Sequence, residues 1–342
     1  MEISTIGLDL AKNVFQVHGV NAHGKAVICK ALRRPQMIPF FRKLSPCVVG
    51  MEACGTSHYW ARELSQLGHV VKLMPPAYVK PYVKRGKTDA GDAAAICEAV
   101  TRPSMRFVAV KSADQQAALC LHRTRDLLVR QRTQSVNMLR GLLAEFGIVM
   151  PKGIWNALKL AEQIVKGECL ALPPAARQSL CHLAEQTHAL HGRVADLDRE
   201  LQAWSRRDET AKRLQTIPGV GVLSASALVS SLADPHQFRS GRQFAAWLGL
   251  TPLARSSGGK ERMGRISKMG DGYIRRLLVS GTMSQLRWAK THPEDAPPWL
   301  VSLLERKPTK LVAVALANKT ARIAWVVMTR GETYRAPQAA QA

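Results

Sequence analysis

Acidic side chains are scarce in this chain of 342 residues, which has 25 aspartates and glutamates against 49 lysines and arginines and a net charge of +24. A compact protein with that excess repels itself unless a polyanion neutralises it. Nucleic acid is the favoured partner, because its binding releases condensed counterions. A membrane surface is the competing polyanion, but the sequence has no basic amphipathic helix with a bulky aromatic face, so no membrane partner is expected.

Metal-binding cysteine pairs, long apolar runs and a leader pattern are also missing. The seven cysteines include no Cys-x-x-Cys pair and no companion histidine spacing, which predicts reduced cytoplasmic thiols rather than a zinc site. The longest apolar runs, 312–317 and 323–328, are too short to span a bilayer and are broken by Lys319 and Arg322. The acidic start Met1-Glu2 runs straight into a strand pattern, which predicts no secretory signal.

The first third of the chain alternates between strand-like and helix-like segments. Short runs rich in β-branched residues are bounded by glycine, proline or polar turns, and amphipathic segments lie between them. This alternation predicts an α/β domain over roughly residues 1–110. The expected strands are a run over 3–20 interrupted near Lys12-Asn13, a return strand over 26–32 after a turn at His23-Gly24, and strands over 47–51 and 69–74; the expected helices cover 57–67 and 89–102, the second with Thr88 as its N-cap.

The middle of the chain, residues 111–210, is expected to be helical. Eight residues recur at alternating spacings of three and four, which is a heptad seam, although a threonine weakens it. The seam can pair with an earlier expected helix, Asp114–Phe146, either as a hairpin inside one chain or as a coiled coil between chains, and a linker at Pro173-Pro174 separates the two helices. The seam consists of Leu180, Leu183, Thr187, Leu190, Val194, Leu197, Leu201 and Trp204.

The remainder predicts a mostly α-helical domain over 211–330, followed by a frayed tail over 331–342. The segment Ile217–Gly221, ahead of an alanine-rich helix that runs through Leu232, resembles a helix-hairpin-helix. In such a hairpin the backbone amides around Gly219 and Gly221 can bind a phosphate without reading base sequence. A tight turn between packed helices is the alternative.

Four acids in the first domain have the order of a hard-cation site. Asp9 lies within an expected strand, where an acid is disfavoured unless it coordinates or pairs, and Glu52 ends another. Asp89 and Asp92 are three residues apart and therefore share one helical face. Taken singly, each acid can be explained without a metal, as a solvated residue at a strand end or as an acid in the first turn of a helix. Together they predict a Mg²⁺ site, since Mg²⁺ prefers a few carboxylates plus substrate phosphate oxygens. An actin-like ATPase would need a Gly-Thr-rich hairpin after Asp9, and Leu10-Ala11-Lys12 stands there instead.

Two basic stretches flank this chemistry. The first precedes Asp89 and carries Tyr78 and Tyr82, which would place cations and stacking rings beside the metal. The second is interleaved with glycines that let the backbone approach phosphates, and it contains Ser257, a nucleophile candidate because of its cationic surroundings. A charged run is otherwise usually just a solvated face. The cations predicted to bind nucleic acid are Lys80, Lys84, Arg85 and Lys87 in the first stretch and Arg255, Lys260, Arg262, Arg265 and Lys268 in the second.

These motifs resemble the DEDD-type insertion-sequence transposases, the IS one-ten family and its IS eleven-eleven subgroup, with the Piv-type DNA invertases as relatives. The likeness covers nearly the whole chain, and two motif blocks in this order are highly specific. The N-terminal block is 7–12, Glu52 and 87–93, and the C-terminal block is 217–221, 244–252, 256–260 and 268–271.

The resemblance implies a RuvC- or RNase H-like N-terminal domain whose four acids hold Mg²⁺. It implies that Ser257, the serine directly before a glycine, attacks the scissile phosphate and forms a covalent protein–DNA intermediate. It further implies double-stranded DNA at element ends and target as substrate, a structured guide RNA, a homodimer or homotetramer, and a nucleoid-associated place in the bacterial cytoplasm. Composition and spacing give no sign of the RNA.

Two other classes of function stay open at this point. A junction nuclease would use the four carboxylates with water, and its strand cleavage would survive Ser257→Ala. A basic, inactive nucleic-acid-binding protein is the non-enzymatic alternative, against which the complete set of acids argues.

Overall fold

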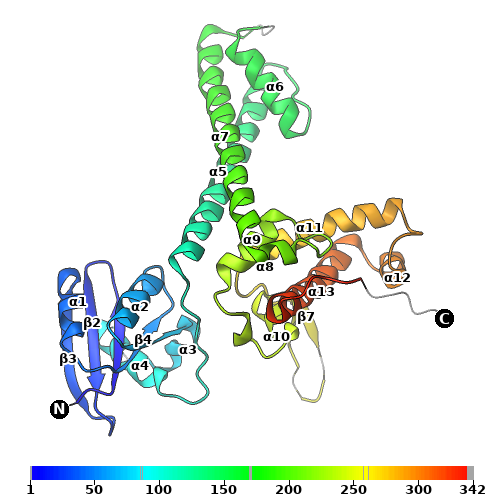
Figure 1. The fold of residues 1–342 in the computed structure, drawn as a ribbon. Helices are drawn as coiled ribbons and strands as arrows, with labels where there is room; N and C mark the ends of the chain where they lie inside the picture. The colour runs from blue at the N-terminus through cyan, green and yellow to red at the C-terminus, as the bar shows by residue number, and fades with distance from the viewer. Residues whose placement is uncertain are drawn as a thin grey trace. The chain divides into compact units, whose positions relative to one another are not determined.

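The computed structural model describes residues 2–84, 86, 88–168, 172–256, 258–260 and 262–336. The chain forms two compact units, which are described separately (Figure 1). The first comprises residues 1–116 together with 230–240, and the second comprises 117–229 together with 241–342. Whether 111–210 forms a domain of its own stays a prediction.

A five-stranded sheet forms the centre of the first unit, with the strand order β3-β2-β1-β4-β5. β1 pairs antiparallel with β2 and parallel with β4, and β4 is parallel to β5. The strands are β1 (Thr5–Leu10), β2 (Val14–Val20), β3 (Ala26–Arg33), β4 (Val48–Glu52) and β5 (Val70–Met74).

The predicted interrupted strand over 3–20 is wrong, because the interruption is a complete chain reversal. Leu10 pairs with Phe15, so the three residues between β1 and β2 form the loop of a hairpin. These residues are exposed, whereas Phe15 is fully buried. The apolar alternation of β2 buries its side chains only if the strand turns back along β1.

Helices cover both faces of the sheet, as the alternation of side chains along β1 shows. Ile6 and Leu8 point into a core with Trp60, whereas Gly7 points to the other face. An added Cβ at Gly7 would lie 2.1 Å from the carbonyl oxygen of Ala93, so glycine is required for α4 to pack this close. The helices of this unit are α1 (Met37–Arg42), α2 (Ser57–Gln66), α3 (Pro76–Val79) and α4 (Asp89–Val100), with short 3₁₀ turns η1 (Arg34–Gln36), η2 (Lys80–Tyr82) and η3 (Pro235–Gln237).

A helical arm consists of α5 (Ala113–Ala144), α6 (Ile154–Val165) and α7 (Pro174–Arg207), and all of it from residue 117 onward belongs to the second unit. The seam residue Thr187 is fully buried, and its hydroxyl lies 2.7 Å from that of Ser135 on α5. Arg125 of α5 forms an ion pair with Asp198 of α7. The seam therefore has partners inside the chain, as a helical hairpin requires, and a coiled coil between chains stays a prediction. The amphipathic α6 was not predicted; its Ala161 and Ile164 complete the core of the arm.

The rest of the second unit surrounds α13, which packs against α10 and α11. α13 is long and apolar enough to cross a membrane by length and composition, but 44% of its most apolar stretch is buried within the protein. The core helix of a globular domain has the same features, so this is weak evidence for a membrane span. The elements are α8 (Glu209–Leu214), α9 (Val222–Ser231), α10 (Gly241–Trp247), β6 (Pro252–Ala254), β7 (Met263–Ile266), α11 (Gly272–Thr291), α12 (Pro298–Arg306) and α13 (Thr309–Arg330).

Candidate active site

Three of the four predicted acids meet at one end of the sheet. Asp9 projects from β1 on the same face as Gly7, toward α4. The Thr88 hydroxyl accepts a hydrogen bond of 3.1 Å from Gly91 N–H, which confirms the predicted N-cap and fixes the first turn of α4. That turn carries Asp89 and Asp92, and one carboxylate oxygen from each of the three aspartates lies within 4.8 Å of the others.

Glu52 belongs to the same electrostatic environment. Leu8 pairs with Met51 across the parallel strands β1 and β4, so the residues that follow, Asp9 and Glu52, are neighbours. Partial burial raises the pKa of Glu52, and the negative charges of Asp9 and Asp92 raise it further. Glu52 therefore lies within the electrostatic influence of two of the three aspartates, although the four acids are up to 83 positions apart in sequence.

The donor set of this cluster fits a divalent cation. It offers carboxylate oxygens, the ligands of a hard metal ion, and among the described residues no histidine or cysteine joins it. Asp9 and Asp92 are half-buried and Asp89 is exposed, so one side of the cluster is open to solvent. Like charges at this spacing repel, and a bound cation relieves that repulsion.

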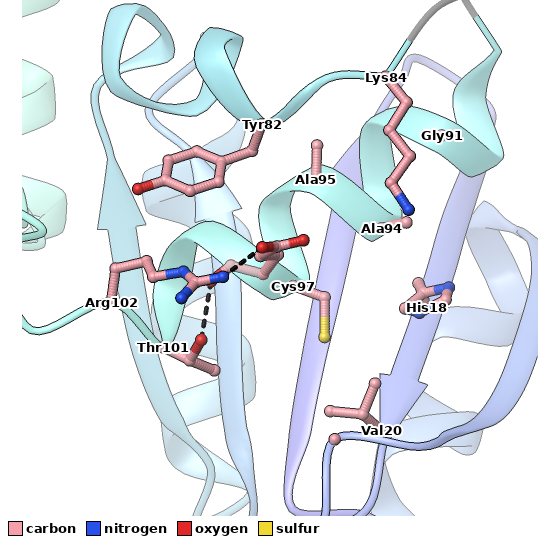
Figure 2. Close-up of a pocket in the computed structure, with 12 residues that line it drawn as sticks. His18, Val20, Tyr82, Lys84, Gly91, Ala94, Ala95, Cys97, Thr101 and Arg102 are labelled. Atoms are coloured by element: carbon pink, nitrogen blue, oxygen red, sulfur yellow. Dashed lines mark hydrogen bonds and ion pairs between the residues drawn. The ribbon is translucent and has the colours of Figure 1, made fainter.

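The first predicted basic stretch partly lies next to this cluster. Lys80 and Lys84 are exposed, and Lys84 reaches the face of the sheet that α4 covers (Figure 2). The predicted Arg85 and Lys87 lie outside the described residues.

A cavity of about 440 Å³ lies between β2 and α4. Figure 2 shows the Lys84 ammonium pointing toward the imidazole of His18, with Tyr82 on the other side of the cavity. Burial, together with the positive charge of Lys84, lowers the pKa of His18, which favours its neutral imidazole. Arg102 forms an ion pair with Glu98, and its guanidinium carbon lies 5.8 Å from the centroid of the Tyr82 ring. The sequence analysis missed His18 and Arg102.

The second basic stretch forms the β6–β7 hairpin. Arg255 N–H donates a hydrogen bond of 2.8 Å to the carbonyl of Arg262, which closes the base of the hairpin loop. Ser256 Oγ accepts a hydrogen bond of 3.3 Å from Arg262 N–H. Ser257 lies outside the described residues, between described neighbours in this loop. All five predicted cations of this stretch are exposed, namely Arg255, Lys260, Arg262, Arg265 and Lys268.

The glycines of this stretch have two different roles. Gly258 and Gly259 have positive φ angles and open space where a side chain would project, as a tight, accessible loop requires. At Gly270, by contrast, a Cβ would lie 1.9 Å from the carbonyl oxygen of Trp247. Gly249 is equally crowded, with an added Cβ 2.4 Å from the backbone of Met269. Close packing of the hairpin base against the end of α10 therefore accounts for the latter two glycines.

The predicted phosphate-binding turn at 217–221 also contains one crowded glycine and one glycine in open space. Gly219 has φ +77 and packs on α11, where a Cβ would lie 2.6 Å from the side chain of Gln285. A Cβ on Gly281 would in turn lie 1.9 Å from the carbonyl oxygen of Gly219. Gly221 is exposed, with nothing within 4 Å of its added Cβ. Close helix packing accounts for the first glycine, and phosphate binding here stays a prediction.

Comparison with known proteins shows which families and individual proteins this chain is similar to. Residues 6–148 match the model of a DEDD transposase family described as "Transposase", and residues 211–296 match the family "Transposase IS116/IS110/IS902 family". A "Probable family 20 transposase" of Pseudomonas aeruginosa is 50% identical over 98% of this chain and 99% of its own length. The "Transposase for insertion sequence element IS1328" of Yersinia enterocolitica is 43% identical, covering 97% of this chain and 98% of the relative. The "Transposase for insertion sequence element IS1111A" of Coxiella burnetii is 39% identical over 98% and 92%.

Proposed function

We propose that this chain, which belongs to the IS110 family of insertion-sequence transposases, cuts and rejoins DNA by serine attack on a phosphate beside the carboxylate cluster. The observation that carries the proposal is the convergence of Asp9, Asp89 and Asp92 within 4.8 Å, with the charge of Glu52 coupled to two of them. Separate parts of the chain contribute these acids, and a basic protein presents them to a polyanion.

The four carboxylates are proposed to hold Mg²⁺, which when bound neutralises charge that builds up on the reacting phosphate. Asp9 is fixed by the β1 strand and Asp89 and Asp92 by a capped helix turn, so their oxygens are positioned before substrate arrives. Asp89 is exposed, so a DNA phosphate is proposed to approach the cluster at this residue.

Ser257 is the proposed nucleophile. Its hydroxyl oxygen forms a bond to phosphorus, the bond from phosphorus to the departing sugar oxygen breaks, and the hydroxyl proton passes to a carboxylate of the site. The energy of the broken phosphodiester is kept in the serine–phosphate bond, so the strand can be rejoined without a further energy source. The loop cations Arg255, Lys260 and Arg262 are proposed to stabilise the charge on the phosphate.

The exposed cations Lys80, Lys84, Arg265 and Lys268 are proposed to bind the backbones of element-end and target DNA, and Gly221 offers a further phosphate contact. Arg85 and Lys87, which lie outside the described residues, and Gly219 complete the set predicted from the sequence. The family resemblance adds three further parts to the proposal. These are a structured guide RNA, a homodimer or homotetramer, and a nucleoid-associated place in the bacterial cytoplasm.

A junction nuclease that uses water with the same carboxylates is the competing function. The test uses element-end DNA and target DNA, with Mg²⁺ and with or without RNA transcribed from the element's non-coding end. Asp9→Asn is expected to abolish cleavage while DNA binding, measured by gel shift, is retained. The matched variant Asp114→Asn changes an exposed acid at the start of α5 and is expected to leave cleavage unchanged. Strand joining that disappears in Ser257→Ala while cleavage continues at the wild-type rate would support the nuclease instead.

A further inference from the structure

The cavity between β2 and α4 has the size and the chemistry of a nucleotide site. Its volume of about 440 Å³ lies within the range of roughly 300–1,000 Å³ typical of small-molecule sites. Gly91, Ala94 and Ala95 on α4 line it, and their small side chains leave the space above the helix open. The flat ring of Tyr82 forms part of the wall (Figure 2).

The polar groups of the cavity suit the separate parts of a nucleotide. The Lys84 ammonium is a cation for a phosphate, and the neutral His18 imidazole can both donate and accept hydrogen bonds at a base edge. Arg102 already lies near the Tyr82 ring, where it can add a cation–π contribution to stacking.

The cavity and the carboxylate cluster lie on the same face of the sheet and on neighbouring turns of α4. Ala95 follows Asp92 by three residues, which is about 4.5 Å along the helix axis. On the sheet, His18 pairs with Gly7 and Gln16 pairs with Asp9, so His18 is two strand residues, about 7 Å, from the position opposite Asp9. A nucleotide bound in the cavity would therefore be next in the strand to the nucleotide whose phosphate contacts the carboxylates.

A second hollow continues the path beyond Tyr82. It has a volume of about 370 Å³ and is lined by Tyr78, Tyr82 and Arg106, among others. Two hollows that share one aromatic ring, with a cation at each, form a track for successive nucleotides of one strand rather than a closed site for a free small molecule.

We propose that the cavity beside α4 binds an unstacked base of the DNA strand being cut, immediately next to the scissile phosphate, with Tyr82 stacking on the base and Lys84 holding its phosphate. The site keeps a nucleotide near the cut out of the double helix, so local strand opening precedes cleavage. This inference rests on the proposed function, because the metal-bound phosphate defines which nucleotide is adjacent.

The test is photocrosslinking of the full-length protein to a single-stranded oligodeoxynucleotide of thymidines with one 5-iododeoxyuridine, in EDTA so that no cleavage is required. Peptide mapping is expected to place the crosslink on Tyr82. Tyr82→Ala is expected to weaken binding of the oligonucleotide about ten-fold, the loss typical of one stacking contact, and Tyr82→Phe to retain it. Tyr59→Ala is the matched control, since Tyr59 is an exposed tyrosine on α2, which packs on the other face of the sheet.

A second variant tests the cavity without removing the ring. Ala94→Phe fills the space from a half-buried position outside the hydrophobic cores, and is expected to weaken binding as much as Tyr82→Ala while metal still stabilises the protein. Unchanged binding in both variants, or a crosslink that maps elsewhere, would overturn the inference. An equal or stronger crosslink with a uridine oligoribonucleotide would overturn the assignment to DNA. Absence of metal-dependent cleavage in the wild type, with the Tyr82 crosslink intact, would instead count against the proposed function.

Discussion

Replacing Glu52 by glutamine removes a charge that destabilises the metal-free protein. Leu8 and Met51 are paired, so Asp9 and Glu52 follow on adjacent strands, and neighbouring strands are about 5 Å apart. Two unit charges at that distance repel by about 0.8 kcal/mol in water and about 3 kcal/mol at an effective dielectric constant of 20. Glu52 is half-buried, so solvent screening favours the lower value, and Glu52→Gln is expected to stabilise the metal-free protein by about 1 kcal/mol at pH 7.

The stabilisation by Glu52→Gln depends on pH and on bound metal. The pKa of Glu52 is raised in the folded protein, so the folded state holds its proton more tightly than the unfolded state. The advantage of glutamine is therefore present at neutral pH and disappears as the pH falls through that raised pKa. A divalent cation at 100 times its Kd stabilises the wild type by about 2.7 kcal/mol, and the variant is expected to gain less.

The assay is hydrogen exchange of peptides from β4 and α4, measured with and without Mg²⁺ or Mn²⁺, because the two units need not unfold together. Glu63→Gln serves as the control, since Glu63 is a half-buried glutamate on α2. Lower protection of the metal-free Glu52→Gln protein together with an unchanged metal response would refute the argument that Glu52 belongs to a cation-binding cluster.

Three further changes have outcomes set by packing and burial. Gly7→Ala places a Cβ 2.1 Å from the Ala93 carbonyl oxygen and is expected to lower the melting temperature of the first unit, whereas Gly55→Ala, in open space, is not. Gly270→Ala is expected to abolish DNA strand joining with less effect on metal-induced stabilisation. His122 is buried, which lowers its pKa to about 4, so its contribution of about 3 kcal/mol to stability is present above pH 6.5 and lost toward pH 4. His122→Gln is expected to flatten the pH dependence of the free energy of unfolding over that range, as measured with denaturant.

Local signals in the sequence were sufficient to predict the helix turn that carries two acids of the carboxylate cluster. Thr88 followed by two acids three residues apart has one low-energy arrangement, a capped helix with both carboxylates in its first turn, and that arrangement forms. Asp9 was noticed because an acid within an apolar strand needs a partner. That Asp9 lies close to Asp89 was predicted only because the four acids were assumed to form one site. No spacing between residues in the sequence requires it.

The features that were missed depend on register and on contacts between distant residues. His18 enters the cavity only because the short loop after β1 sets the pairing of β2, and the sequence analysis had no turn there. Gly270 is one of the glycines of the second basic stretch, and its close packing could not be predicted because Trp247, 23 positions away in sequence, crowds it through the backbone alone. Thr187 looked like a defect in the heptad seam because its hydroxyl partner, Ser135, lies on another helix.

The central claim is that the carboxylate cluster and Ser257 act together on one phosphate, and the mass of the covalent product tests it most directly. The wild-type protein is mixed with nicked element-end DNA and Mg²⁺, denatured, digested and analysed by mass spectrometry. One peptide carrying a nucleotide in phosphodiester linkage to Ser257 is expected from the wild type, and none from Asp9→Asn or Ser257→Ala. DNA cleaved by the wild type with no covalent peptide, or the same adduct formed by Asp9→Asn, would contradict the claim.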